Sequence, residues 1–276
     1  MIDIIQGIKR FFKNLVGPWR PDSAFIAIWN LAVLATILMQ AFLSPLILVF
    51  LQDSSHVDSD ILLMHLIIDA VYLVSILIHF RTAFYHHGEL RAQHKDIFFN
   101  YLNSGLIPDL LSELAIFGRL ASSSSGVKYL GLLALLRIYR IPVLLASIED
   151  YFQFNRKVKT MVEVSKLVFV VFILAHWFGC ILYSITKIEE NQVNWLTTVQ
   201  GVDAGDVTGF YVASLYWAIM TMSTVGYGDI APITTNERVL TIAIMIISSI
   251  VFGFLLSAIG SLLLEFSRFS SESRYV

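Results

Sequence analysis

Six long apolar segments alternate with shorter polar stretches along the chain, and each approaches the length of a membrane-spanning helix. They cover residues 25–50, 61–80, 99–117, 127–146, 162–185 and 239–264. About 20 apolar residues in a helix cross the hydrocarbon core of a bilayer, so this pattern predicts six transmembrane helices. We expect Pro45 to kink or end the first. The third is the most polar, because it contains Asn103, Pro108, Asp109 and Glu113.

A shorter apolar run, residues 211–222, lies between the fifth and sixth spans and leads into the sequence TVGYGD. It predicts a re-entrant pore helix followed by a selectivity filter at residues 224–228. Backbone carbonyl oxygens from several chains around one axis can replace the water shell of a K⁺ ion. Gly226 and Gly228 allow the positive φ angles that such a backbone needs, and Thr224 adds a hydroxyl oxygen at the inner end.

The surrounding residues favour a filter over the alternative, a glycine-rich turn between two membrane helices. An apolar helix precedes the motif, Asp229 and Pro232 follow it, and a long apolar helix begins near Val239. On the predicted pore helix, Tyr216 and Trp217 are candidates for aromatic packing that supports the filter. Lipid or core contact elsewhere is the alternative for these two side chains.

The composition agrees with a membrane protein. Of the 276 residues, 57% are hydrophobic and 14% are charged, and the mean hydropathy is +0.72. A soluble domain of this length carries more polar residues on its surface. The net charge of −2 excludes the strongly basic balance of a nucleic-acid-binding protein. The single cysteine, Cys180, excludes an internal disulfide bond.

The distribution of Lys and Arg predicts the orientation of the helices. Basic residues gather in segment 1–24, after the second span and before the fifth, whereas the loop after the first span is acidic. Positively charged loops stay on the cytoplasmic side, so both termini are expected there, with the filter opening outward. Residues 1–24 are predicted to form an amphipathic cytoplasmic segment, and residues 186–209 an extracellular turret.

The fourth span carries a stripe of basic and small residues at every third position. Its members are Lys128, Gly131, Ala134, Arg137 and Arg140. This spacing keeps side chains on one side of a helix, as a voltage-sensing helix requires, so the three basic residues are candidate sensor charges. The alternative is a static pair of arginines, neutralised by carboxylates or extended to the inner membrane surface. Both interpretations stay open at this point.

Three acidic residues in the second and third spans are the expected partners of these arginines. They are Asp69, Asp109 and Glu113. Ionisable groups within a membrane normally face protein or water and pair with one another, and Asp109 and Glu113 share a helix face because they are four residues apart. A proton relay is the rival interpretation, but no series of titratable groups continues across the spans.

These features together predict an all-α membrane protein with two modules. A four-helix, voltage-sensor-like bundle covers residues 25–146, and a linker covers residues 147–157. A pore domain, residues 158–265, contains two helices, the re-entrant pore helix and the filter. Residues 266–276 begin a cytoplasmic carboxy-terminal region.

Several stretches resemble one family, the six-span potassium channels of the cyclic-nucleotide-binding-domain superfamily, which includes plant inward-rectifier, ether-a-go-go and nucleotide-gated channels. They are SLYWAIMTMSTVGYGDI (214–230), AHWFGC (175–180), YLNSGLIPDLLSEL (101–114) and LLRIYRIPVLLASIEDYFQFN (135–155). The resemblance implies K⁺ sites at Thr224, Val225, Gly226 and Tyr227, with Asp229 at the outer mouth. It also implies sensor roles for Arg137 and Arg140, with Asp69 and Asp109 as their acidic partners.

The same resemblance implies a homotetramer, or a heterotetramer with related subunits, embedded in lipid of the plasma membrane and without a nucleic-acid partner. K⁺ is the expected permeant ion, and no covalently bound cofactor is expected. Cyclic-nucleotide control would need a domain that these 276 residues do not contain. The rivals are a poorly selective cation channel of the same superfamily and a modulatory subunit. A membrane enzyme is not expected, because the sequence shows no catalytic constellation.

Overall fold

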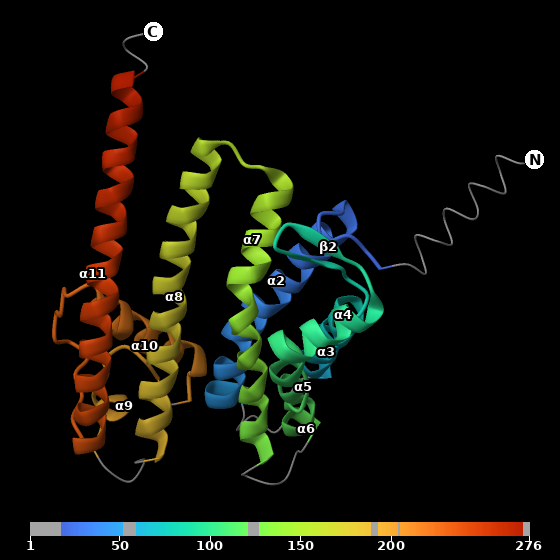
Figure 1. Ribbon diagram of the computed structural model, residues 1–276. Coiled ribbons are helices and arrows are strands. Elements are labelled where there is room, and N and C mark those ends of the chain that lie inside the picture. The colour runs from blue at the N-terminus through green and yellow to red at the C-terminus, as the bar shows by residue number, and fades with distance from the viewer. Residues whose placement is uncertain (1–17, 52–58, 121–126, 189–192, 204, 273–276) are drawn as a thin grey trace, which may run out of the picture. The chain divides into compact units, whose positions relative to one another are not determined.

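The computed structural model describes residues 18–51, 59–120, 127–188, 193–203 and 205–272, so most of the predicted amino-terminal segment 1–24 lies outside the described residues. The chain divides into two compact units. The first comprises Met1–Ser44 and Ser55–Phe154, and the second comprises Pro45–Ser54 and Asn155–Val276. Helices make up nearly all of both units (Figure 1).

The first unit contains a helical bundle and one short β-hairpin. Its elements are α2 (Ala24–Leu46), α3 (Ser59–His79), β1 (Phe84–His86), β2 (Glu89–Arg91), α4 (His94–Tyr101), η2 (Leu102–Leu106), α5 (Ile107–Glu113), α6 (Ala115–Leu120), η3 (Val127–Arg140) and α7 (Ile141–Phe152). Its core includes Val33 and Ile37 of α2, Tyr72 and Ile76 of α3, and Leu144 of α7. Val33 and Ile37 lie four residues apart, as do Tyr72 and Ile76, so one apolar face of α2 meets one apolar face of α3 in this core.

The predicted third span, residues 99–117, differs in the structure. The helix begins earlier, at His94, passes through the π-helical turn η2 and is interrupted again at Leu114. Pro108 has no amide hydrogen to donate to the preceding turn, and a π-helical turn next to it accommodates that loss. Pro45 acts similarly in the first span, where α2 ends at Leu46 and continues as the π-helical turn η1 (Ile47–Leu51).

The predicted linker, residues 147–157, is mostly helical. α7 continues to Phe152, and Gln153 ends it with a left-handed φ of 43°. The helix α8 then begins at Arg156, so only three residues join the two helices. Most of the predicted linker is thus a continuation of α7, and the short connection between the helices lies at residues 153–155.

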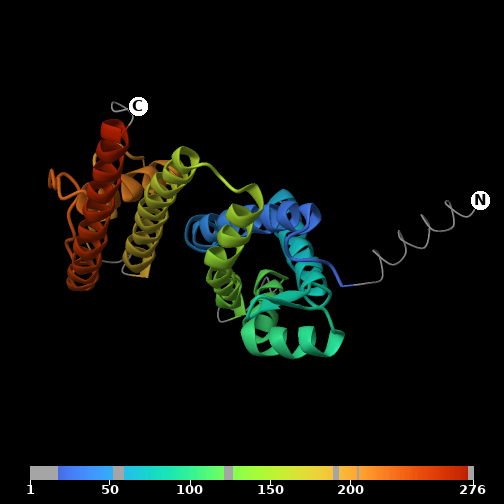
Figure 2. The ribbon, with the colours of Figure 1, turned by 45° about the horizontal axis from the view of Figure 1, so that its top comes forward.

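The second unit contains η1, α8 (Arg156–Ile188), α9 (Trp195–Thr198), α10 (Val207–Met222) and α11 (Thr235–Glu272). The long helices α8 and α11 run side by side (Figures 1 and 2). The helix α10 packs tightly on α8, because a Cβ atom at Gly179 would lie 3.1 Å from the backbone of Ser214. A glycine therefore permits this close approach of two backbones.

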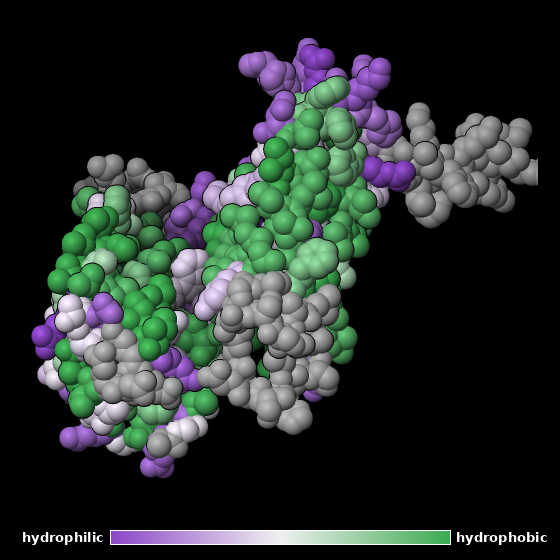
Figure 3. All heavy atoms as spheres, turned by 90° about the horizontal axis from the view of Figure 1, so that it is seen from below, coloured by the Kyte–Doolittle hydropathy of each residue, from purple (hydrophilic) through white to green (hydrophobic). Residues whose placement is uncertain are grey.

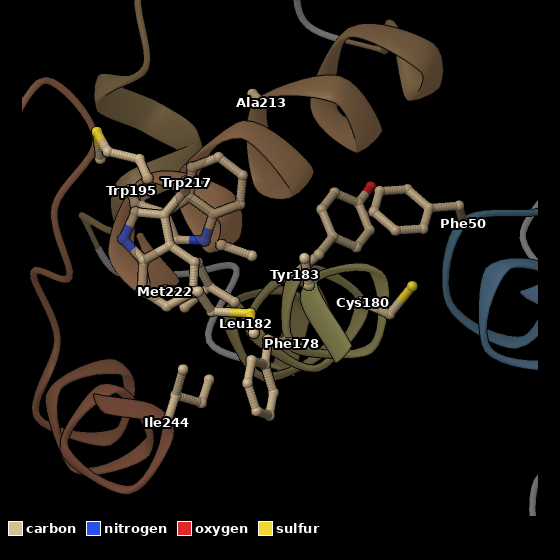
Figure 4. Close-up of a cluster of buried hydrophobic side chains, with 13 residues drawn as sticks. Phe50, Phe178, Cys180, Leu182, Tyr183, Trp195, Ala213, Trp217, Met222 and Ile244 are labelled. Carbon is tan, nitrogen blue, oxygen red and sulfur yellow. The ribbon is translucent and has the colours of Figure 1, made fainter. Parts of the chain in front are cut away.

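The core of the second unit is a cluster of aromatic and aliphatic side chains from several elements (Figure 4). Trp217 of α10 and Trp195 of α9 both belong to it, together with Tyr183 of α8, whose ring stacks on that of Phe50 with centroids 4.1 Å apart. The predicted turret, residues 186–209, is therefore not simply a solvated loop, because α9 inserts a buried tryptophan into the core.

Four helices are long and apolar enough to cross a membrane among the described residues: Ala24–Phe50, Tyr129–Phe152, Val158–Ile188 and Thr235–Leu264. The apolar part of the predicted second span is shorter, Leu63–His79, and the interrupted third span is not among them. Hydrophobic side chains cover much of the helices in Figure 3, as expected for helices that face lipid or other chains.

Candidate functional site

The filter sequence forms an extended segment directly after α10. The predicted pore helix, α10, ends at Met222, and the predicted positive φ angles are found at Gly226 (59°) and Gly228 (81°). Thr224 also has a positive φ of 62°, which the sequence did not predict. A β-branched residue in this conformation is strained, and such strain is concentrated at functional sites.

The amide groups of the predicted filter segment are held by the end of α10. The carbonyl oxygen of Met220 accepts hydrogen bonds from the amides of Val225 (3.1 Å) and Gly226 (3.4 Å). The Met220 sulfur lies 3.2 Å from the amide of Tyr227. Among the described residues, no hydrogen bond is donated to the carbonyl oxygens of residues 224–228. These oxygens are therefore available to another partner.

The predicted filter segment is exposed in the single chain. Val225 is 53% exposed and Tyr227 is 75% exposed in the single chain. A Cβ atom added at Gly226 would meet no atom within 4 Å, so the constraint at this glycine comes from its φ angle and not from crowding within the chain.

The two aromatic residues predicted to support the filter have different surroundings. The Tyr216 hydroxyl donates a hydrogen bond to Oδ2 of Asp229 at 2.9 Å, which connects the pore helix with the outer end of the filter. Trp217 points into the core cluster of the second unit and is almost fully buried. Tyr216 therefore contacts the filter segment directly, whereas Trp217 fixes the pore helix from behind.

In the first unit, the basic stripe lies on η3, and this helix is a 3₁₀-helix. A 3₁₀-helix has three residues per turn, so every third side chain stands directly above the last. The stripe that ends at Arg137 and Arg140 thus forms a straight row along η3. The side chain of Lys128 lies outside the described side chains.

Arg137 is paired with two acidic residues, as the sequence predicted. Its guanidinium donates to Asp69 of α3 at 3.0 Å and to Glu113 of α5 at 2.8 Å, and its side chain is 1% exposed. The guanidinium carbon also lies 4.1 Å from the centre of the Tyr72 ring, a favourable cation–π distance.

Arg140 is paired with Asp109, the third predicted acidic residue. Its Nε donates to Oδ1 at 2.8 Å, and its Nη2 forms an ion pair with Oδ2. His79, a residue that the sequence did not suggest, accepts a hydrogen bond from Nη1 of Arg140 at 2.6 Å. Three tyrosine hydroxyls complete the surroundings of Asp109, namely those of Tyr72, Tyr101 and Tyr139.

Sequence reasoning missed His79 and the three tyrosines. A buried tyrosine usually finds a partner for its hydroxyl, so three tyrosines in otherwise apolar spans were a signal that a shared acceptor lies among them. The arrangement fixes two cations and three carboxylates inside one helical bundle, which is a charge distribution that a membrane potential can act on.

The fold and these two sites define a helical membrane protein with a charged, sensor-like bundle and a pore-type re-entrant segment. The model of the ion transport protein family matches residues 26–271, and the chain belongs to this family. It is therefore an integral membrane protein of an ion-transport family and not an enzyme.

Curated relatives agree with the predicted resemblance to potassium channels. The chain is 27% identical to the potassium voltage-gated channel protein eag of Drosophila melanogaster, over 91% of this chain and 23% of that protein. It is 23% identical to the voltage-gated inwardly rectifying potassium channel KCNH2 of Cavia porcellus, over 92% and 21%. It is 25% identical to KCNH6 of Homo sapiens, over 92% and 28%. The chain thus spans about a quarter of the length of these relatives.

Proposed function

We propose that this chain is a subunit of a K⁺-selective channel whose ion path is formed by residues 224–228. The filter backbone carries the proposal: its amides are bonded to the pore helix, and its carbonyl oxygens accept no hydrogen bond from the described residues. Several such strands around one axis would offer K⁺ the oxygen ligands that replace its water shell.

Four copies of this chain, or copies together with closely related chains, would complete that path. The exposed filter residues and the largely unburied helix α11, with exposed Ile242, Met245 and Ile246, support such an assembly. In the apolar part of α11, Thr235–Leu264, only 17% of the most apolar stretch is buried within the chain. The remainder would contact lipid and neighbouring subunits, in a plasma membrane with both termini in the cytoplasm.

The selectivity prediction is that current reverses close to the K⁺ equilibrium potential. With K⁺ inside and Na⁺ outside a patch of membrane containing the chain, the reversal potential should follow a change in external K⁺. A reversal potential near zero under these conditions would instead support a poorly selective cation channel. If the chain carries current only after a relative is co-expressed, it is a modulatory subunit.

We also predict that opening depends only weakly on voltage. Strongly voltage-gated channels move about 3–4 charges per subunit, and moving one charge across 100 mV is worth about 2.3 kcal/mol. Here the described stripe has two charged side chains, Arg137 and Arg140, and each is bonded to a carboxylate. Each subunit should therefore contribute at most about half of the electrical work of a full sensor.

The limiting slope of conductance against voltage in excised patches measures the charge that moves across the membrane when the channel opens. We expect a shallow slope, with a ligand, lipid or partner on the cytoplasmic side controlling the open probability. An effective valence of about twelve charges for four subunits would contradict the prediction.

A further inference from the structure

A fully buried carboxylate, Glu237, lies in the first turn of α11 at the outer end of the pore unit. The side chain is 0% exposed. It belongs neither to residues 224–229 nor to the ion pairs of Arg137 and Arg140. A sequence signal for this residue was present, because Thr234 and Glu237 form the Ser/Thr-x-x-Glu pattern that begins many helices.

One oxygen of Glu237 is bonded to the neighbouring helices. The Thr186 hydroxyl, in the last turn of α8, lies 2.9 Å from Oε1 and also 2.9 Å from the carbonyl oxygen of Leu182, so these two acceptors share its hydrogen. The backbone amide of Trp195, at the start of α9, lies 3.5 Å from the same oxygen. This side of the carboxylate therefore fixes the turret helix and the end of α8 to the beginning of α11.

The other oxygen binds the segment that returns from the filter. The backbone amides of Ile233 and Thr234 donate to Oε2 at 2.7 Å and 3.1 Å. The Thr234 hydroxyl in turn accepts a hydrogen bond from the Glu237 amide at 3.2 Å. Every one of these contacts to the carboxylate comes from a donor, as an ionised carboxylate requires, and the positive end of the α11 dipole stabilises its charge.

Ile233, whose amide Glu237 binds, lies four residues after Asp229 at the outer end of the filter. The filter is held along residues 225–227 by Met220 and at its outer end by the bond between Tyr216 and Asp229. Only residues 230–232 separate Asp229 from the amide of Ile233 that Glu237 binds. Movement of this short return segment therefore displaces the outer end of the filter.

We infer that Glu237 is a positioning residue of the conduction path, which holds the outer end of the filter by anchoring the segment that follows it. This inference rests on the proposed function. Loss of the carboxylate leaves buried amides without an acceptor, and the return segment then becomes free to move. The filter should consequently leave its conducting form more readily while the channel is open.

The test compares four single substitutions in the full chain by recording current during a maintained opening. Glu237→Gln removes the charge, and Thr186→Val removes one donor while leaving the carboxylate in place. Thr186→Ser removes only the methyl group and keeps the hydroxyl donor. Thr241→Val is the matched control, because Thr241 is a buried threonine of the same helix whose hydroxyl has no hydrogen-bond partner among the described residues.

We expect current to decline about tenfold faster in Glu237→Gln and to a smaller extent in Thr186→Val, since charge-assisted hydrogen bonds are lost. Raised external K⁺ should slow the decline, because an occupied filter resists rearrangement, and a purely structural defect would not respond in this way. Thr186→Ser and Thr241→Val should behave as the wild type. Unchanged decline in Thr186→Val, together with unchanged decline in any Glu237→Gln channels that reach the surface, would overturn the inference.

A second measurement separates this inference from the proposed function. In the purified full chain, hydrogen exchange of the Ile233 and Thr234 amides should be at least about tenfold faster in Glu237→Gln than in Thr241→Val. If the wild type conducts no K⁺, the proposed function fails, and the exchange rates still decide whether Glu237 anchors the segment. Equal exchange in the two variants would show that it does not.

Discussion

Substituting Gly226→Ala is expected to abolish K⁺ current while the protein still folds and reaches the membrane. Gly226 has φ of 59°, a left-handed conformation that costs a residue with a Cβ atom roughly 1–2 kcal/mol. In four subunits around one ion path this amounts to about 4–8 kcal/mol, which is enough to favour another filter conformation. A single chain tolerates the cost, because the added Cβ meets no neighbouring atom within 4 Å.

Gly131→Ala provides the matched control. Gly131 lies in η3, a Cβ atom there also meets open space, and its φ is not in the left-handed region. Currents and surface labelling of both variants should be compared with those of the wild type. Normal K⁺ current in Gly226→Ala, at equal surface labelling, would contradict the proposed filter.

Much of the candidate site follows from sequence because it depends on local chemistry. The filter glycines need a conformation that only glycine adopts at low cost, and Gly226 and Gly228 have it. The acidic residues of the second and third spans were expected to pair with arginines, since an isolated charge within a membrane is unfavourable. The structure contains those pairs, and their individual assignment required the three-dimensional arrangement.

The parts that sequence did not predict depend on tertiary packing. The 3₁₀ geometry of η3 is not encoded by spacing, because residues three apart share a face in an α-helix as well. The left-handed Thr224 is held by contacts with the end of α10, although threonine alone disfavours this conformation. His79 joins the Arg140 site from α3, 61 positions away in the chain.

The carboxyl end of α7 shows that hydropathy does not locate the end of a helix. Ser147, Glu149 and Asp150 are polar and follow an apolar stretch, so they suggested a linker. In the structure the helix continues to Phe152, with Leu144 and Ile148 buried, Ser147 accepting a hydrogen bond from Asn30 of α2, and Asp150 exposed. Polar residues after an apolar span therefore do not show whether the linker they form is helical.

Two of the three acidic partners of Arg137 and Arg140, namely Asp109 and Asp69, are expected to differ strongly in importance. Asp109 provides the carboxylate of Arg140 within the described residues, so Asp109→Asn leaves a buried cation unpaired. Breaking a buried pair in this way lowers the free energy of unfolding by about 3–5 kcal/mol. Asp69→Asn should lower the free energy of unfolding by only about 1 kcal/mol, because Arg137 keeps its ion pair with Glu113 at 2.8 Å. Thermal unfolding of the purified variants, together with surface labelling in cells, measures the difference.

A double substitution tests whether the unpaired charge causes the damage. In Asp109→Asn with Arg140→Gln, neither a buried cation nor a buried anion remains at this site, so much of the lost stability should return. The same second substitution in an otherwise wild-type chain should be destabilising, because it leaves Asp109 with only its tyrosine donors. Equal destabilisation by Asp109→Asn and Asp69→Asn, or no recovery in the double variant, would show that the Arg140–Asp109 pair does not hold this bundle together.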